Sequence, residues 1–145
     1  MNRRLFLLSA IPIPFYPATS LEVFSPEEGR IVEALCDQII PADDAAGAKQ
    51  AGVLYYIDRQ LAGPLKRFQL RYHDRLPAFR TLPDLPFDEQ TAFLRNLKGD
   101  AESFFQLVID HTMQGFYGSP AHGGNRDEAS WKMLGVQDVM QGHPH

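Results

Sequence analysis

The chain has 145 residues, of which 44% are hydrophobic and 22% charged, the size and composition of one small globular domain. Its 14 basic and 18 acidic side chains give a net charge of −4, so it has no basic field to neutralise nucleic-acid phosphates. A single cysteine, Cys36, excludes an intramolecular disulfide, a Cys-rich zinc site, a Cys-ligated iron–sulfur cluster and covalent haem attachment.

Residues 1–20 are predicted to be an export signal that does not belong to the folded domain. Basic residues precede an apolar stretch over 5–15, and the small residues 18–20 suit cleavage by signal peptidase. The first part fits the core of a twin-arginine signal, which takes folded proteins across the bacterial inner membrane, although the general secretory route remains an alternative. The residues that carry this motif are Arg3, Arg4, Phe6 and Leu7.

The apolar stretch is too short to span a bilayer, which takes roughly 20 residues. Pro12 and Pro14 would also interrupt a helix through it. A transmembrane anchor is therefore the less favoured interpretation, and the leader predicts a periplasmic protein carried by the twin-arginine translocase.

The first predicted helix begins at Ser25, which can cap it, with Pro26 at its first position and Glu28 placed to complete a capping box. Its apolar face includes Cys36, which we expect to be a small buried hydrophobe. Pro41 ends it.

Three further segments show helical spacing of apolar residues. Residues 52–61 repeat apolar side chains every four positions and end at Gly63, and a third stripe of the same period covers 68–79. The segment 81–86 holds two prolines and is predicted to be a loop. Asp88 is expected to cap a fourth helix.

The most apolar run, residues 101–113, predicts a fifth helix that Gly115 ends. An irregular loop over 119–125 and a short helix over 127–134 follow. No alternating strand pattern occurs. The sequence therefore predicts an all-α protein, a single compact irregular bundle of about five to six helices. It places the domain at 21–136 and a frayed tail at 137–145.

Two groups of residues are candidates for chemistry. Asp43 and Asp44, with Asp37 upstream, could hold a divalent cation or act as a general acid and base. Their position after Pro41 favours the simpler interpretation that they form a turn. His111 lies in the apolar fifth helix and is more simply explained as a hydrogen-bonded, partly buried side chain.

The stretch 115–126 is distinctive because it combines adjacent aromatics, four glycines, a histidine and an arginine, with Trp131 close behind. Aromatic residues and arginine supply much of the binding energy at protein interfaces. A packed loop that covers the end of the bundle would have the same composition, so both interpretations stay open.

Blocks in order along residues 24–136 closely resemble the gluconate 2-dehydrogenase subunit 3 family, the small subunits of bacterial membrane-associated dehydrogenases for sugars, sugar acids and polyols. The blocks are Ile-Ile-Pro-Ala-Asp-Asp at 39–44, Ala-Gly-Val at 51–53, Gly-Phe-Tyr-Gly-Ser-Pro at 115–120, His-Gly-Gly-Asn-Arg-Asp at 122–127 and Trp-Lys-Met-Leu-Gly at 131–135. The chain departs from the family in being short after Gly135 and in having Ala121 where an aromatic is common.

The resemblance implies a subunit with no cofactor of its own. In the family the large subunit is an FAD-binding flavoprotein of the glucose-methanol-choline (GMC) oxidoreductase type, and many complexes add a membrane cytochrome c subunit that carries haem c. The resemblance further implies a folding and export companion, whose leader carries the folded large subunit across the membrane.

On these grounds no catalytic or metal-binding residue is expected in this chain, and its predicted site is an interface with the large subunit. The predicted contacts are Phe116, Tyr117, His122, Gly123, Gly124, Asn125, Arg126 and Trp131, with Asp43 and Asp44 as a second patch. Two alternatives remain: a free-standing enzyme that uses Asp43, Asp44 and His111, and a free-standing periplasmic interaction domain.

Overall fold

A computed structural model describes residues 20–118 and 124–130. Within these ranges the chain is helical and has no strand, which confirms the all-α prediction. The α-helices are α2 (Pro26–Ile39), α3 (Val53–Ala62), α4 (Gln69–Arg75), α5 (Phe87–Arg95) and α6 (Asp100–Tyr117). Short 3₁₀ helices lie between or after them: η1 (Lys66–Phe68), η2 (Leu76–Phe79), η3 (Leu82–Asp84) and η5 (Arg126–Glu128).

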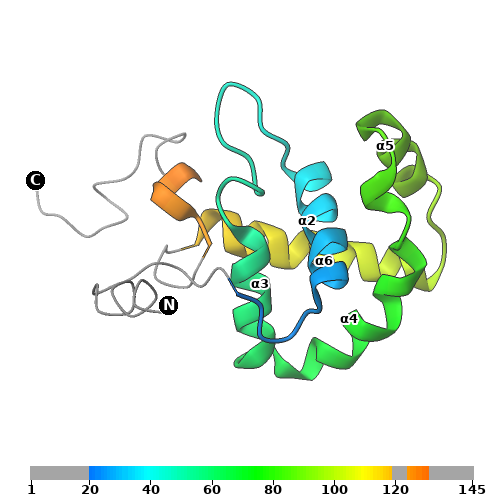
Figure 1. The fold of residues 1–145 in the computed structure, drawn as a ribbon, viewed down its shortest axis with the longest axis horizontal. Helices are drawn as coiled ribbons and strands as arrows, with labels where there is room; N and C mark the ends of the chain where they lie inside the picture. The colour runs from blue at the N-terminus through cyan, green and yellow to red at the C-terminus, as the bar shows by residue number, and fades with distance from the viewer. Residues whose placement is uncertain (1–19, 119–123, 131–145) are drawn as a thin grey trace, which may run out of the picture.

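The core forms where α2, α3 and α6 meet. Each of these three helices contacts the other two, and α4 packs on α6 farther along its length. Figure 1 shows α6 running the length of the molecule behind α2 and α3, with α4 and α5 toward its N-terminal end. The apolar side chains at the centre are fully buried: Val32, Leu35, Ile57, Leu61, Phe104 and Val108.

The predicted start of α2 is confirmed in detail. The Glu28 backbone N–H donates to Ser25 Oγ at 3.1 Å, and the Ser25 N–H donates to Glu28 Oε1 at 2.9 Å. This reciprocal capping box satisfies two amides that the helix leaves unpaired. Pro26 occupies the first turn, and the helix ends at Ile39, before Pro41.

The second helix also follows its prediction to within a residue, since α3 begins at Val53 and ends at Ala62. Gly52 precedes it with a φ of 74°, in the left-handed region where a side chain is disfavoured. A β-carbon there would also run into the Arg126 side chain. The backbone thus favours glycine at position 52, and the absence of a side chain leaves room for the Arg126 side chain.

The third stripe is not one helix. Residues 68–79 divide into the end of η1, α4 and η2, and Pro77 lies at the start of η2. Proline lacks the N–H of a continuing α-helix, and its ring clashes with the preceding turn. The predicted loop at 81–86 similarly contains η3. The apolar spacing nevertheless marked buried positions correctly, because Tyr72, Leu76 and Phe79 have no exposed surface.

Two predicted helix ends are wrong. Asp88 does not cap α5, because Pro86 is the N-cap residue and Asp88 lies inside the first turn. Gly115 does not end α6, which continues to Tyr117. A β-carbon at Gly115 would lie 2.6 Å from Tyr56 Cδ2, so this glycine allows α6 to approach α3 closely.

Several predictions fall outside the described residues. They include the leader up to residue 19, the loop residues 119–123, the part of the 127–134 helix beyond residue 130, and the tail at 137–145. Among the residues that are described, no helix combines the length and the hydropathy needed to cross a membrane.

Candidate partner interface

The segment 124–126 packs tightly against the end of α6 and the beginning of α3. A β-carbon on Gly124 would lie 2.5 Å from the Gly115 carbonyl oxygen and 2.9 Å from Tyr56 Cβ. The Arg126 backbone N–H donates to the Ala51 carbonyl at 2.9 Å. The contact of Gly115 and Gly124 with each other and with α3 is hereafter the glycine junction.

Asn125 fixes the path of this segment. Its φ is 47°, and its side chain donates to the Gly118 carbonyl at 2.7 Å. Asn125 Oδ1 accepts from the Ser130 backbone at 2.8 Å and from the Ser130 hydroxyl at 2.9 Å. Asparagine tolerates the left-handed region better than most residues and hydrogen-bonds local backbone, so Asn125 shapes the loop from within.

The predicted contacts at this end divide into buried and exposed residues. Phe116 and Asn125 have no exposed surface, so in this conformation neither offers a side chain to a partner. Tyr117 is 40% exposed and packs edge-on against the Phe116 ring at 4.9 Å between centroids. Arg126 is partly exposed, with its Cζ 4.6 Å from the centre of the Tyr55 ring. The predicted contacts His122, Gly123 and Trp131 lie outside the described residues.

Asp43 and Asp44 lie on the exposed loop between α2 and α3. The Ala45 backbone N–H donates to Asp43 Oδ1 at 2.8 Å, and the Asp43 N–H donates to the Ala45 carbonyl at 3.1 Å. Asp43 thus forms a local turn, as the simpler interpretation of the two aspartates predicted. Asp44 remains an exposed carboxylate at the surface of the same loop.

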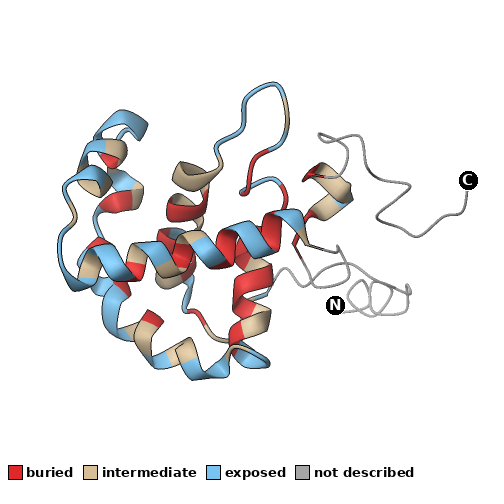
Figure 2. Cartoon of the chain, turned by 180° about the vertical axis from the view of Figure 1, so that it is seen from behind, coloured by how far each residue is buried: buried red, intermediate tan, exposed pale blue. Residues whose placement is uncertain are grey.

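An apolar strip on the outer face of α6 was missed in the sequence. Phe105, Ile109, Met113 and Tyr117 are spaced four residues apart, so they share one face of the helix. Met113 is 42% exposed, and the other three are exposed or half-buried. Figure 2 shows α6 crossing the side of the molecule opposite to α2 and α3, with no other described element over it. These four residues are called the α6 strip.

The α6 strip begins at a shallow groove. Beside Phe105 lies a pocket of about 200 Å³ whose other walls come from the end of α2 and from α5: Gln38, Thr91, Leu94 and Arg95. The i, i+4 spacing was visible in the sequence. From the sequence alone, however, the α6 strip could not be distinguished from the buried stripe of the same helix, because both stripes consist of apolar residues at helical spacing.

The buried polar groups of the core are paired with one another. Tyr72 Oη lies 2.8 Å from His111 Nδ1, and Cys36 Sγ lies 3.5 Å from Thr112 Oγ1. Burial lowers the pKa of His111; Asp110 opposes this and Arg67 reinforces it. Burial raises the pKa of the Cys36 thiol to about 12. The imidazole is thus neutral at pH 7, and Cys36 is the inert hydrophobe expected of it.

His111 and the loop aspartates do not form one site. The imidazole is 3% exposed and stacks on the Tyr72 ring with 5.8 Å between centroids, whereas Asp43 and Asp44 are exposed. A general base must reach the proton that it removes, and His111 has no such access while the core is closed.

A second surface pocket is polar. It measures about 210 Å³ between α2, the following loop and η3, and its charged walls are Arg30, Glu33, Asp37 and Lys49. Two basic and two acidic groups line it, so the pocket carries no field of one sign. Across residues 20–118 and 124–130, no three His, Cys, Asp or Glu side chains gather as they would around a metal ion.

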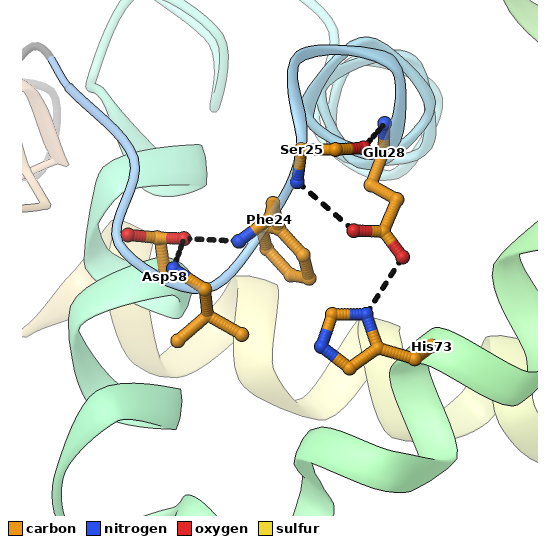
Figure 3. A network of polar contacts seen from close by, with 6 residues as sticks. Phe24, Ser25, Glu28, Asp58 and His73 are labelled. Atoms are coloured by element: carbon orange, nitrogen blue, oxygen red, sulfur yellow. Dashed lines mark hydrogen bonds and ion pairs between the residues drawn. The ribbon is translucent and has the colours of Figure 1, made fainter.

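A buried carboxylate fixes the start of the domain, and sequence analysis did not single it out. Asp58, on α3, is 3% exposed and accepts three backbone hydrogen bonds from Glu22, Val23 and Phe24 at 2.6, 2.9 and 2.9 Å. Figure 3 shows Asp58 beside the extended segment that enters α2. We call this arrangement the Asp58 clamp. The only feature of the sequence that could have drawn attention to Asp58 is an acidic residue directly after Ile57, on the apolar stripe of the helix.

The clamp continues into the capping box of α2. Beyond its bond to Ser25, Glu28 also lies 2.7 Å from His73 Nδ1 on α4, as Figure 3 shows. Burial raises the pKa of Glu28, but the hydrogen bonds from His73 and Ser25 and the His73 charge together outweigh it and lower the pKa. The ionised carboxylate is thus the form that links α2 to α4.

Comparison with known proteins supports the resemblance seen in the sequence. No curated protein and no solved structure matches the chain significantly. The family model of gluconate 2-dehydrogenase subunit 3 matches residues 26–137, which begin at the first residue of α2 and include the glycine junction. The chain therefore belongs to the gluconate 2-dehydrogenase subunit 3 family.

Proposed function

We propose that this chain is the non-catalytic small subunit of a periplasmic FAD-dependent dehydrogenase, and that it acts as the folding and export companion of the large flavoprotein subunit. Membership of the gluconate 2-dehydrogenase subunit 3 family carries this proposal. In the proposed complex the GMC-type large subunit binds FAD and oxidises the substrate. A membrane cytochrome c subunit with haem c would pass the electrons onward.

The α6 strip supports a protein partner. Met113 and Tyr117 together place a flexible thioether and a large aromatic on a helix face that no other described element covers. Aromatic and methionine side chains are enriched at protein interfaces, and methionine adapts to irregular partner surfaces. Tyr117 also belongs to the predicted contact set, so the α6 strip and the partly exposed Arg126 define the surface that we assign to the large subunit.

Hydrogen bonds within the fold occupy two of the candidate catalytic groups, which supports an accessory role over the alternative of a free-standing enzyme. His111 is held by Tyr72 in the core, and Asp43 by its own turn. Both have structural partners that account for them. A free-standing interaction domain remains the other alternative, and the co-purification experiment below distinguishes it from a dehydrogenase subunit.

The export role is tested by the double substitution Arg3→Lys and Arg4→Lys in the native host. We expect the large subunit and its dye-reducing activity to move from the periplasm to the cytoplasm, because the twin-arginine route requires both arginines. Arg80→Lys, at an exposed position of the folded domain, is the matched control and should leave export unchanged. Periplasmic activity that survives the double substitution would remove the export role.

The interface is tested by Met113→Glu and affinity purification of the tagged chain. A carboxylate in the α6 strip would be desolvated by a partner, so we expect the flavoprotein and its flavin absorption to be lost from the eluate. Leu70→Glu is the matched control, because Leu70 is another apolar residue, 70% exposed, on α4. A flavoprotein that is retained equally by both variants would place the interface elsewhere.

A further inference from the structure

The first described residues of the chain are anchored to the folded domain. Phe24 is 4% exposed, and its ring lies 5.5 Å from the Tyr72 ring in the core. Leu21 is half-buried against Gly29 on α2, where a β-carbon would lie 2.7 Å from Leu21 Cδ1. Between them, Glu22 and Val23 donate their amides to Asp58. The chain is therefore held from residue 21 onward.

The anchored segment leads directly into the first helix, α2. Phe24 is the third residue of the Asp58 clamp, and the next residue, Ser25, is the N-cap of α2. Glu28 ties that cap to His73 on α4. Pulling residues 21–24 away from the domain would thus break the clamp and disturb the capping box together.

The small residues 18–20, which suit signal-peptidase cleavage, end one residue before this held segment. A protease acts on chain that is extended and free to enter its groove. On a folded protein the rate follows the free energy of local opening. The twin-arginine route delivers the domain already folded, so the clamp is closed when the peptidase meets it.

We infer that the Asp58 clamp protects the peptide bonds around residue 20 from signal peptidase, so that the exported chain keeps its leader. The inference rests on the proposed export role. A retained leader leaves the apolar stretch 5–15 attached to the domain, where it can hold the subunit and its flavoprotein at a lipid surface.

The test uses the purified full chain with signal peptidase in detergent micelles, followed by intact-mass spectrometry. We expect the wild type to stay at 16.4 kDa. A short Gly-Ser linker inserted between Ser20 and Leu21 leaves the clamp intact but separates the cleavage segment from it, and should speed cutting at least about tenfold. The same linker between Lys98 and Gly99, both exposed, is the control and should leave the chain resistant.

Asp58→Ala tests the cause directly. Loss of three charge-assisted hydrogen bonds should speed cleavage at least about tenfold, and Asp58→Asn, which keeps acceptor oxygen, should lie between Ala and wild type. Because Asp58→Ala removes a buried acceptor and could unfold the domain, its helicity is checked by circular dichroism. The linker variant keeps the test decisive in either case.

Two results would overturn the inference: a wild type cut as fast as the linker variant, or a linker variant as resistant as the wild type. The assay contains no translocase, so it is independent of the export experiment. A chain that fails to carry its partner out of the cytoplasm removes the proposed function. Cleavage of the wild type in micelles removes only the clamp as a barrier.

Discussion

Two segments far apart in the sequence are held against α3 in opposite ways. The Asp58 clamp holds residues 22–24 by polar contacts, since one carboxylate accepts three amides. The glycine junction holds residues 124–126 by close approach, since Gly115 and Gly124 have no side chains to keep the backbones apart. Strength in the first depends on charge and solvation, and in the second on volume.

The two regions therefore tolerate different kinds of substitution. A polar anchor is sensitive to the loss of its acceptor, because buried amides without partners carry the full cost of their desolvation. A steric anchor is sensitive to added atoms, because close-packed interiors accommodate extra methyl groups poorly. The predictions below test this distinction, beginning with the largest effect.

Asp58→Ala should lower the free energy of unfolding by about 3–5 kcal/mol, because it leaves buried amides without an acceptor. Urea denaturation followed by circular dichroism measures the change. Asp44→Ala is the control, since that exposed carboxylate should contribute less than about 0.5 kcal/mol. Equal stabilities of the two variants would show that the clamp does not anchor the domain.

Gly115→Ala should lower the free energy of unfolding by about 2 kcal/mol despite the better helix propensity of alanine, because the new methyl group meets Tyr56 and Val53 of α3. Gly63→Ala is the matched control, since its nearest neighbour, the Arg59 carbonyl oxygen, would lie 3.8 Å away. Thermal unfolding of both variants makes the comparison. A Gly115→Ala variant as stable as Gly63→Ala would contradict the steric account of the junction.

Acid should weaken the capping box of α2, which adjoins the Asp58 clamp, through the Glu28 carboxylate. The lowered pKa of Glu28 means that its stabilisation is fully present above the ordinary value of 4.5 and is lost as the pH falls through the folded value. His111, with its pKa also lowered, adds a loss of stability below its ordinary 6.5.

Glu28→Gln isolates the first of these contributions, because glutamine keeps the capping geometry without the charge. Its deficit against the wild type should be largest near neutral pH and shrink toward about pH 3, while the His111 contribution cancels in the difference. Urea denaturation across this range measures it. A deficit independent of pH would mean that the Glu28 charge adds nothing to the link between α2 and α4.

The smallest effect concerns the aromatic support of Arg126. Tyr55→Leu keeps apolar volume but removes the ring under the guanidinium, and should cost about 0.5 kcal/mol. Tyr55→Phe retains the ring and should match the wild type in thermal unfolding. If the two substitutions are equivalent, the cation–π contact does not contribute to holding the segment.

Local signals predicted the parts of the fold that local interactions decide. The capping box at Ser25 and Glu28 involves residues three apart, and the stop before Pro41 follows from proline's missing N–H. The same kind of signal was wrong at Gly115, because a glycine that ends a helix and one that admits a neighbouring helix look identical along the chain. Only the position of Tyr56 distinguishes them.

The two anchors could not be predicted because their partners are distant in sequence. Asp58 meets amides 34 to 36 positions earlier, and nothing local marks an acid for that role. Tyr117 and Arg126 were predicted as contacts from composition, and they do present surface. Phe116 has the same interface-like composition but faces the core, because composition does not reveal which side of α6 a residue occupies.

The buried Cys36 makes the opening of the core measurable under native conditions without an introduced cysteine. Its thiol has no exposed surface and a pKa raised to about 12, so a thiol reagent can modify it only after α2 separates from α6. Because it is the sole cysteine, the rate of modification gives the free energy of that opening from a single position. Every variant discussed above can thus be ranked under native conditions, without denaturant.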